Sequence, residues 1–374
     1  MSLTVCLSAN TVHYPDGGGH FWAHLNWALG LRALGCRVIW LEGIDAATPL
    51  QDARAQLTVL KRRLEVFGFA SSLAVCDWSG ARLPVTDGCL DVDAAAEADL
   101  LLDLRYDISP QVIARFRRTA MVDIDPGILQ FWIRQGKIDL APHDVYFTIG
   151  EPNVQSGGPF SASDHRWLHT APPVFLPEWQ VSPSEPTASF TTISNWWGEW
   201  MEFDGQLFSN EKRTAFLEYL ELPSQTSASL ELALLLEEQP EVERPFLERH
   251  GWRVRRAWEV TATPEKYRRY IQQSRGEFSC AKPAYVRFAD AWMSDRTVCY
   301  LASGKPAVVQ YTGSSRLLPD RSGLFRFRTP DEAAACLKTV EADYATHCRL
   351  ARALAEELFD ARKVVGHVLE HALT

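Results

Sequence analysis

The stretch from Leu3 to Leu41 decides the fold: LTVCLSANTVHYPDGGGHFWAHLNWALGLRALGCRVIWL. Its first residues, Leu3–Ser8, form the apolar run of a buried strand. The glycines of DGGGH follow, and Phe21–Leu34 then carries apolar side chains at helical spacing. Gly35 is suited to end that helix, and Arg37–Leu41 is a second apolar run. A strand, a glycine loop, a helix and a strand in this order predict a βαβ unit, which implies a parallel sheet.

The alternation of strands and helices continues and predicts a Rossmann-like, doubly wound domain over residues 1–171. Five prolines lie between Pro172 and Pro186, a density that neither a helix nor an interior strand tolerates, so residues 172–188 are predicted to be a linker. The alternation restarts over residues 189–360, and residues 361–374 are predicted to form a last helix. The expected fold is α/β, with two Rossmann-like domains facing across a cleft and helices at the C-terminal end.

Composition narrows the function classes. Among the 374 residues, 46% are hydrophobic and 23% charged, which is typical of a globular protein and excludes a disordered or collagen-like chain. No apolar run approaches the ~20 residues of a membrane span. The net charge of -9 argues against a nucleic-acid partner. Eight cysteines without a C-x-x-C pair, and an N-terminus without signal-peptide features, predict reduced thiols in a cytoplasmic protein.

The glycine loop is the first candidate site. Gly17, Gly18 and Gly19 would let backbone N–H groups approach an anion at the helix N-terminus, although a simple tight turn is the alternative. The loop is neither G-x-G-x-x-G nor a P-loop. His20, in the first helical turn, is predicted to be a general base, because a helix N-terminus favours its neutral form. Asp16 is the second candidate for this base, with turn formation as its alternative role.

A D-x-D pattern, Asp123 and Asp125, ends a predicted strand. Two carboxylates at this spacing point to one face and could hold a divalent cation that bridges a diphosphate. Because Asp-Pro-Gly is also a turn signal, we favour a turn at this place and expect no metal.

The segment from Ser274 to Gly313 carries the strongest pattern. Ser294 or Asp295 is predicted to cap a helix, and a helix N-terminus beside Arg296 and Lys282 suits a diphosphate. After this helix, Ala-Ser-Gly-Lys-Pro leads into an apolar strand. An earlier loop, which follows the first strand of the second domain, adds polar groups. The predicted donor-binding residues are Ser194, Asn195, Lys282, Ser294, Asp295, Arg296 and Thr297.

This segment, together with the glycine loop and its histidine, resembles glycosyltransferases of the GT-B fold. The resemblance implies that the second domain holds a nucleotide sugar, that the glycine loop faces the acceptor, and that the helix at 361–374 packs back on the first domain. The E-x7-E signature of many retaining members is missing, because Ala291 and Cys299 stand at its two positions. Inversion and retention both stay open.

The expected function is transfer of a hexose from a nucleotide-diphosphate sugar, as co-substrate, to a hydroxyl-bearing small molecule or glycan. No further cofactor is expected. Two alternatives remain. One is a Rossmann oxidoreductase, in which Glu42 at the end of the second strand would bind a ribose. The other is a non-catalytic nucleotide- or sugar-binding protein.

Overall fold

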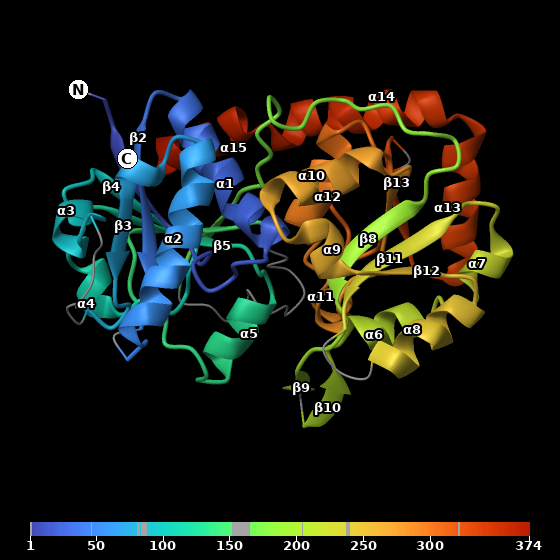
Figure 1. Ribbon diagram of the computed structural model, residues 1–374, viewed down its shortest axis with the longest axis horizontal. Helices are drawn as coiled ribbons and strands as arrows, with labels where there is room; N and C mark the ends of the chain where they lie inside the picture. The colour runs from blue at the N-terminus through green and yellow to red at the C-terminus, as the bar shows by residue number, and fades with distance from the viewer. Residues whose placement is uncertain are drawn as a thin grey trace. The chain divides into compact units, whose positions relative to one another are not determined.

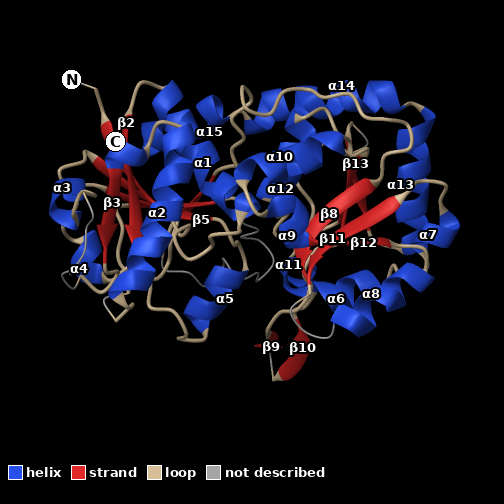
Figure 2. Cartoon of the chain, in the orientation of Figure 1, coloured by secondary structure: helices blue, strands red, loops and turns tan. Residues whose placement is uncertain are grey.

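A computed structural model describes residues 2–45, 47–80, 83, 88–151, 165–203, 205–236, 240–320 and 322–374. The chain divides into two compact units. Unit 1 comprises Met1–Phe175 and Ala361–Thr374, and unit 2 comprises Leu176–Asp360. Each unit contains a parallel sheet with helices packed against it (Figure 2).

The sheet of unit 1 has the order β3-β2-β1-β4-β5-β6-β7, and every neighbouring pair is parallel. Successive residues of the strands β4 and β5 are buried, so both faces of the sheet are covered there. The strands are β1 (Thr4–Ser8), β2 (Arg37–Gly43), β3 (Leu73–Cys76), β4 (Leu100–Asp103), β5 (Thr119–Asp123), β6 (Val145–Thr148) and β7 (Trp167–His169).

The last helix of the chain belongs to unit 1, where it lies against the first helix (Figure 1). The close approach needs Gly30, because a Cβ at that position would lie 2.8 Å from a Val365 methyl and 3.0 Å from the Ala361 carbonyl oxygen. Gly35 has a φ of +85° and ends the first helix, as predicted. The helices are α1 (Gly18–Ala33), α2 (Leu50–Val66), η1 (Ala70–Ser72), α3 (Val92–Ala96), α4 (Pro110–Ile113), α5 (Ile128–Arg134) and α15 (Ala361–Ala372).

Unit 2 repeats the strand order. Its sheet runs β12-β11-β8-β13-β14-β15. If the strands of each sheet are numbered along the chain, both sheets have the order 3-2-1-4-5-6, and unit 1 adds a seventh strand at the end. A separate antiparallel hairpin, β9–β10, is inserted after β8. The strands are β8 (Phe190–Asn195), β9 (Trp200–Phe203), β10 (Gln206–Ser209), β11 (Leu230–Leu235), β12 (Arg253–Arg256), β13 (Gly276–Ser279), β14 (Ala307–Gln310) and β15 (Leu324–Phe327).

The core of unit 2 is aromatic. The Phe278 ring stacks on that of Phe327 at 5.3 Å, and Trp196 and Phe216 are buried beside them. The helices are α6 (Lys212–Leu217), α7 (Leu222–Gln225), α8 (Pro240–Arg249), α9 (Ala257–Thr261), α10 (Pro264–Gln273), α11 (Pro283–Phe288), α12 (Asp295–Ala302), α13 (Pro330–Ala342), α14 (Tyr344–Leu354) and the π-helical turn η3 (Ala355–Phe359).

The proline-rich segment 172–188 contains no helix, and the boundary between the units falls within it. It is not a solvated tether, however. Trp179 is fully buried, and its ring meets that of Tyr267 edge-on at 6.3 Å. Much of the segment predicted to be a linker therefore packs as part of unit 2.

Candidate functional site

The predicted donor residues gather at the carboxyl edge of the sheet in unit 2. There β8 ends at Asn195 and β13 ends at Ser279, and α12 begins at Asp295. Ser294, Arg296 and Thr297 line a narrow pocket of about 20 Å³ together with residues that follow β13 and β14. Ligands of open α/β sheets bind at this edge, so the topology brings these residues to a functional position.

Arg296 is tied to the protein on every side. Its Nε donates to the Glu277 carboxylate at 2.8 Å, Nη1 donates to the Ile193 carbonyl at 2.8 Å, and Nη2 donates to Ser279 Oγ at 2.6 Å. Burial opposes the charge of Arg296, but the adjacent Glu277 carboxylate raises the pKa of its guanidinium above the ordinary value. The guanidinium thus joins the ends of β8 and β13 to α12, and the Glu277 carboxylate neutralises its charge.

Lys212 brings a second cation to this place. Its ammonium group is buried and donates to the carbonyl of Cys280, directly after β13. Burial, followed by the charges of Arg296 and Lys282, lowers the pKa of Lys212 to about 7. Lys212 is therefore poised to gain a proton when negative charge arrives.

Lys282 is the third cation. It is half-buried at the residue that precedes α11, and its ammonium group makes no hydrogen bond or ion pair with the described residues. We refer to Lys212, Lys282 and Arg296 as the cation cluster. Glu277 neutralises Arg296, so the cluster keeps a surplus of positive charge at Lys282.

The start of α12 agrees with the predicted cap. Ser294 Oγ accepts a hydrogen bond from the Arg296 N–H at 3.2 Å, which makes Ser294 the N-cap. Asp295 lies in the first turn, where its negative charge offsets the partial positive charge of the helix N-terminus and so disfavours an anionic ligand. Asp295 therefore has the weakest physical case among the predicted donor residues. Gly304, with a φ of +68°, ends the same helix as the sequence predicts.

The end of β8 supplies two further polar residues. Ser194 Oγ donates to the Asn195 carbonyl at 2.7 Å, so its lone pairs can still accept a hydrogen bond from a ligand. The side chain of Asn195 is exposed. Because Arg296 binds the Ile193 carbonyl, Ser194 and Asn195 lie next to the cation cluster.

The glycine-rich segment of unit 1 forms less of a loop than expected. Helix α1 begins at Gly18, so Gly18 and Gly19 form its first turn, and only Gly17 precedes it. None of these three glycines has a positive φ. The expectation of a three-glycine loop is thus wrong in its extent. Gly18 is buried, and no acidic residue occupies the first turn of α1.

His20 is half-buried in this first turn. Its Nε2 lies 2.5 Å from the carbonyl oxygen of Asn10 and must donate to it, because a carbonyl only accepts. The neutral imidazole then keeps its lone pair on Nδ1, the form that a general base needs. Asp16 is exposed, and its carboxylate makes no hydrogen bond with the described residues. His20 and Asp16 both remain predictions for the base.

Glu42, by contrast, is fully engaged. It is buried and accepts from the Thr11 N–H at 2.9 Å, the Val12 N–H at 3.3 Å, the Trp40 indole at 2.9 Å and the Thr11 hydroxyl. With these donors in place, its carboxylate anchors the segment after β1 and is not presented to a ribose. This removes the residue on which the oxidoreductase alternative depended.

Asp123, the first residue of the D-x-D pattern, is also buried. Asp123 accepts from the Asp125 N–H at 2.9 Å, from Gln130 Nε2 at 2.8 Å and from Thr148 Oγ1 at 3.1 Å. Burial raises the pKa of Asp123 to about 7. Gly127, with a φ of +75°, completes the turn. Within the described part of the chain, no three or more His, Cys, Asp or Glu side chains are grouped so as to hold a metal ion.

Two contributors to the site were undervalued or missed by sequence reasoning. Lys212 gives only a weak signal in the sequence, a lysine at the start of a helix, and its contact with Cys280 joins residues far apart in the chain. Glu277 gave one usable signal, a charged residue in an otherwise apolar strand, since a buried carboxylate requires a partner.

No known protein family and no curated protein matches this sequence. Solved structures do match. An alpha-glucosyltransferase in complex with UDP-glucose and DNA containing an abasic site has a TM-score of 0.61 at 10% identity, over 100% of both chains. AviGT4, a glycosyltransferase involved in avilamycin A biosynthesis, has a TM-score of 0.56 at 16% identity, over 99% of this chain and 97% of its own.

A third match is Anabaena Alr3699/HepE in complex with UDP and glucose, with a TM-score of 0.56 at 13% identity over 99% of each chain. These similarities show that the chain has the GT-B fold, which confirms the fold class expected from the sequence. None of the described helices is long and apolar enough to cross a membrane.

Proposed function

We propose that this protein is a glycosyltransferase that moves a hexose from a nucleoside-diphosphate sugar to a hydroxyl group of an acceptor. The cation cluster at the carboxyl edge of unit 2 is the observation that carries the proposal. A surplus of positive charge there, in a chain with the GT-B fold, fits a diphosphate. Since two of the three reported structures are complexes with UDP-glucose or with UDP, a uridine nucleotide is the first ligand to test.

On the donor side, Lys282 would contact the diphosphate directly, because its ammonium group has no other partner among the described residues. Lys212 would become fully protonated as the diphosphate binds, since added negative charge raises the pKa of a neighbouring ammonium group. Arg296 would act by holding the ends of β8 and β13 against α12. The cluster would stabilise the charge that develops on the leaving diphosphate.

On the acceptor side, His20 would remove the hydroxyl proton in an inverting reaction, using the lone pair on Nδ1. Asp16 is the second candidate for this role. A retaining reaction would need neither residue. Gly17, Gly18 and Gly19 would leave room for the substrate beside the first turn of α1.

We further propose that the reaction needs no metal, because the lysine charges of the cation cluster would neutralise the diphosphate. The acceptor would be a small molecule or a glycan rather than a nucleic acid, given a net charge of -9. Full activity in excess EDTA would support the first statement. A loss of activity in EDTA that Mn²⁺ or Mg²⁺ restores would contradict it.

The test has two stages. Titration calorimetry with UDP, GDP, ADP and TDP identifies the nucleotide that binds. At 100 times its Kd, that nucleotide should also raise the free energy of unfolding by about 2.7 kcal/mol. Release of that nucleotide from its sugar is then followed with and without hydroxyl acceptors. Binding with turnover supports the proposal. Binding without transfer or donor hydrolysis would indicate the non-catalytic alternative, and no binding of any nucleotide would refute the donor site.

A further inference from the structure

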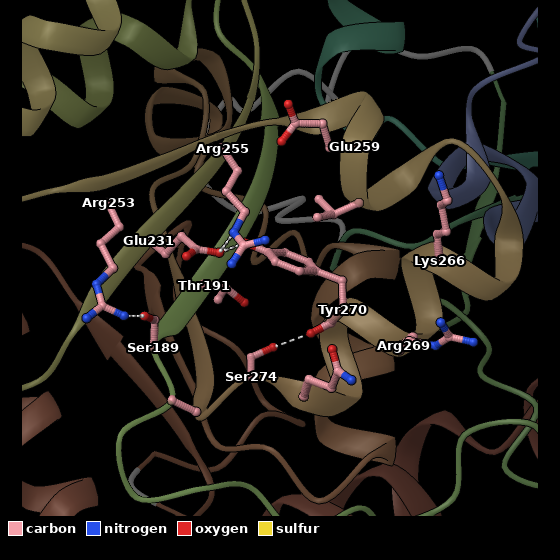
Figure 3. Close-up of a pocket in the computed structure, with 13 residues that line it drawn as sticks. Ser189, Thr191, Glu231, Arg253, Arg255, Glu259, Lys266, Arg269, Tyr270 and Ser274 are labelled. Atoms are coloured by element: carbon pink, nitrogen blue, oxygen red, sulfur yellow. Dashed lines mark hydrogen bonds and ion pairs between the residues drawn. The ribbon is translucent and has the colours of Figure 1, made fainter.

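Unit 2 contains a second polar cavity, which is separate from the cation cluster. It has a volume of about 390 Å³ and lies between the sheet and helices α9 and α10 (Figure 3). Its floor is formed where strands begin: Ser189 directly precedes β8, Glu231 is near the start of β11, and Arg253 opens β12. The cation cluster lies at the opposite ends of the strands, so the two places are distinct.

The strand register builds the floor of this cavity. Thr191 pairs with Glu231, and Glu231 pairs with Arg253, so the three side chains stand in a row on one face of the sheet. Arg255, two residues along β12, points to the same face. Tyr270 from α10 donates its hydroxyl to Glu231 at 2.8 Å, and Arg255 lies 3.0 Å from the same carboxylate. The floor is therefore polar, with Thr191 and Glu231 buried and the two arginines exposed.

The charge around the cavity is positive. Figure 3 shows Arg253 and Arg255 on the strand side, with Lys266 and Arg269 on the helix side. Against these four cations stand Glu231, which Arg255 already neutralises, and the exposed Glu259. Neither Lys266 nor Arg269 makes a hydrogen bond or ion pair with the described residues. In a chain with a net charge of -9, this local excess of cations is what an anionic ligand requires.

We propose that this basic cavity binds a phosphorylated sugar. Its volume falls near the lower end of small-molecule sites, ~300–1,000 Å³. Arginine and lysine side chains suit a phosphate, and the Gln273 amide suits sugar hydroxyls. Ser189 Oγ already bonds to Ser229 at 2.9 Å and accepts from Arg253 at 3.3 Å, so it adds at most one further lone pair. Tyr270 is the only aromatic residue that lines the described cavity, and only 9% of its surface is exposed, so little of its ring is offered to a nucleobase.

Calorimetry with glucose 6-phosphate tests the proposal, with glucose and inorganic phosphate as reference ligands. Glucose 6-phosphate should bind, glucose should not, and inorganic phosphate should bind more weakly because it lacks the sugar contacts. Binding should persist in saturating UDP, since the cation cluster lies elsewhere. Loss of glucose 6-phosphate binding in UDP would overturn the proposal, as would equal affinity for inorganic phosphate or no binding at all.

A pair of double variants locates the site. Lys266→Gln with Arg269→Gln should lower the affinity for glucose 6-phosphate by about tenfold or more, because two charge-assisted contacts are lost. Both residues are exposed, so the fold should persist, and the unfolding midpoint checks this. Arg249→Gln with Lys338→Gln removes the same charge from exposed positions elsewhere in unit 2 and should leave affinity unchanged. Equal weakening in both double variants would show a general charge effect and refute the site.

Discussion

The two units have the same strand order but opposite chemistry at the carboxyl edges of their sheets. In unit 1, Glu42 and Asp123 are buried carboxylates whose hydrogen-bond donors come from the unit itself. In unit 2, the corresponding edge carries Lys212, Lys282 and Arg296. The shared topology explains why polar groups collect at this edge in both units. The side chains alone decide that unit 2 is suited to an anion.

A third carboxylate of unit 1 shows how closed its edge is. Asp103 accepts from Ser8 Oγ at 2.5 Å and lies 3.1 Å from His143 Nε2. His143 Nδ1 is 2.7 Å from the Ala141 carbonyl, so both imidazole nitrogens face acceptors. Ser8 and Asp103 thereby join the ends of β1 and β4, and His143 packs against them. In unit 1, the groups that we propose for contact with an acceptor are instead at the start of α1, above all His20.

The largest expected effect is a loss of kcat when His20 is replaced, which tests whether unit 1 supplies the general base. His20→Ala should reduce kcat by about 10²–10⁴-fold, because a general base is lost, while affinity for the nucleotide stays unchanged. His13→Ala is the matched control, since His13 is exposed nearby and only donates to the Gly43 carbonyl. Steady-state kinetics and calorimetry measure the two quantities. A fall in kcat below about threefold, well under that range, would leave Asp16 or a retaining reaction as the better explanation.

The next effect concerns Arg296, which the sequence suggested as a donor contact. Arg296→Met should lower the free energy of unfolding by about 3–5 kcal/mol, because Glu277 would be left as a buried, unpaired carboxylate. Adding Glu277→Gln to this variant should restore most of the loss. Urea unfolding provides the measurement. If Arg296→Met left stability unchanged but weakened nucleotide binding, the guanidinium would be a direct ligand contact after all.

In unit 2, burial of Lys212 should make the free energy of unfolding depend on pH. Burial lowers the pKa of Lys212 to about 7 from an ordinary value of 10.5, so the unfolded chain binds more protons between these limits. Lys212 should therefore make stability rise with pH from about 7 to 10.5, by at most ~1.4 kcal/mol per pH unit. Lys212→Met should remove this contribution. Unfolding free energies of both proteins across this range test it, and identical slopes would contradict the buried cation.

Unit 1 should show the opposite sign at Asp123. Burial raises the pKa of this carboxyl to about 7 from 3.8, so the folded chain binds more protons in that window. Its contribution is fully present below about pH 4 and is lost as the pH rises through about 7, again by at most ~1.4 kcal/mol per pH unit. The difference in unfolding free energy between Asp123→Asn and the parent should shift in favour of the variant from pH 4 to pH 8. A difference that does not vary with pH would refute the raised pKa.

Much of this fold was predictable because its elements carry local signals. The apolar runs Leu3–Ser8 and Arg37–Leu41 predicted strands β1 and β2, and the cap predicted at Ser294 or Asp295 placed the start of α12. Other elements were missed because they are short or lack periodicity. Strands β3 and β7 have four and three residues, and the hairpin β9–β10 exposes both Trp200 and Leu207.

The candidate site was less predictable, because its chemistry depends on contacts between distant segments. The sequence indicated the cap at Ser294 and the cation at Lys282. It could not show that Arg296 is occupied by Glu277, or that Lys212 reaches the carbonyl of Cys280. Residue types alone do not distinguish a cation held by the protein from one that is left for a ligand.

Nucleotide binding by a Lys282→Gln variant tests the central claim most directly. Lys282 has no partner among the described residues, so its loss should leave the fold intact. Calorimetry should show UDP, or whichever nucleoside diphosphate binds best, weakened by about tenfold to a hundredfold, since a charge-assisted contact contributes about 1.5–3 kcal/mol. Lys338→Gln, an exposed lysine on α13, should bind like the parent. Unchanged affinity in Lys282→Gln would contradict a diphosphate site at the cation cluster.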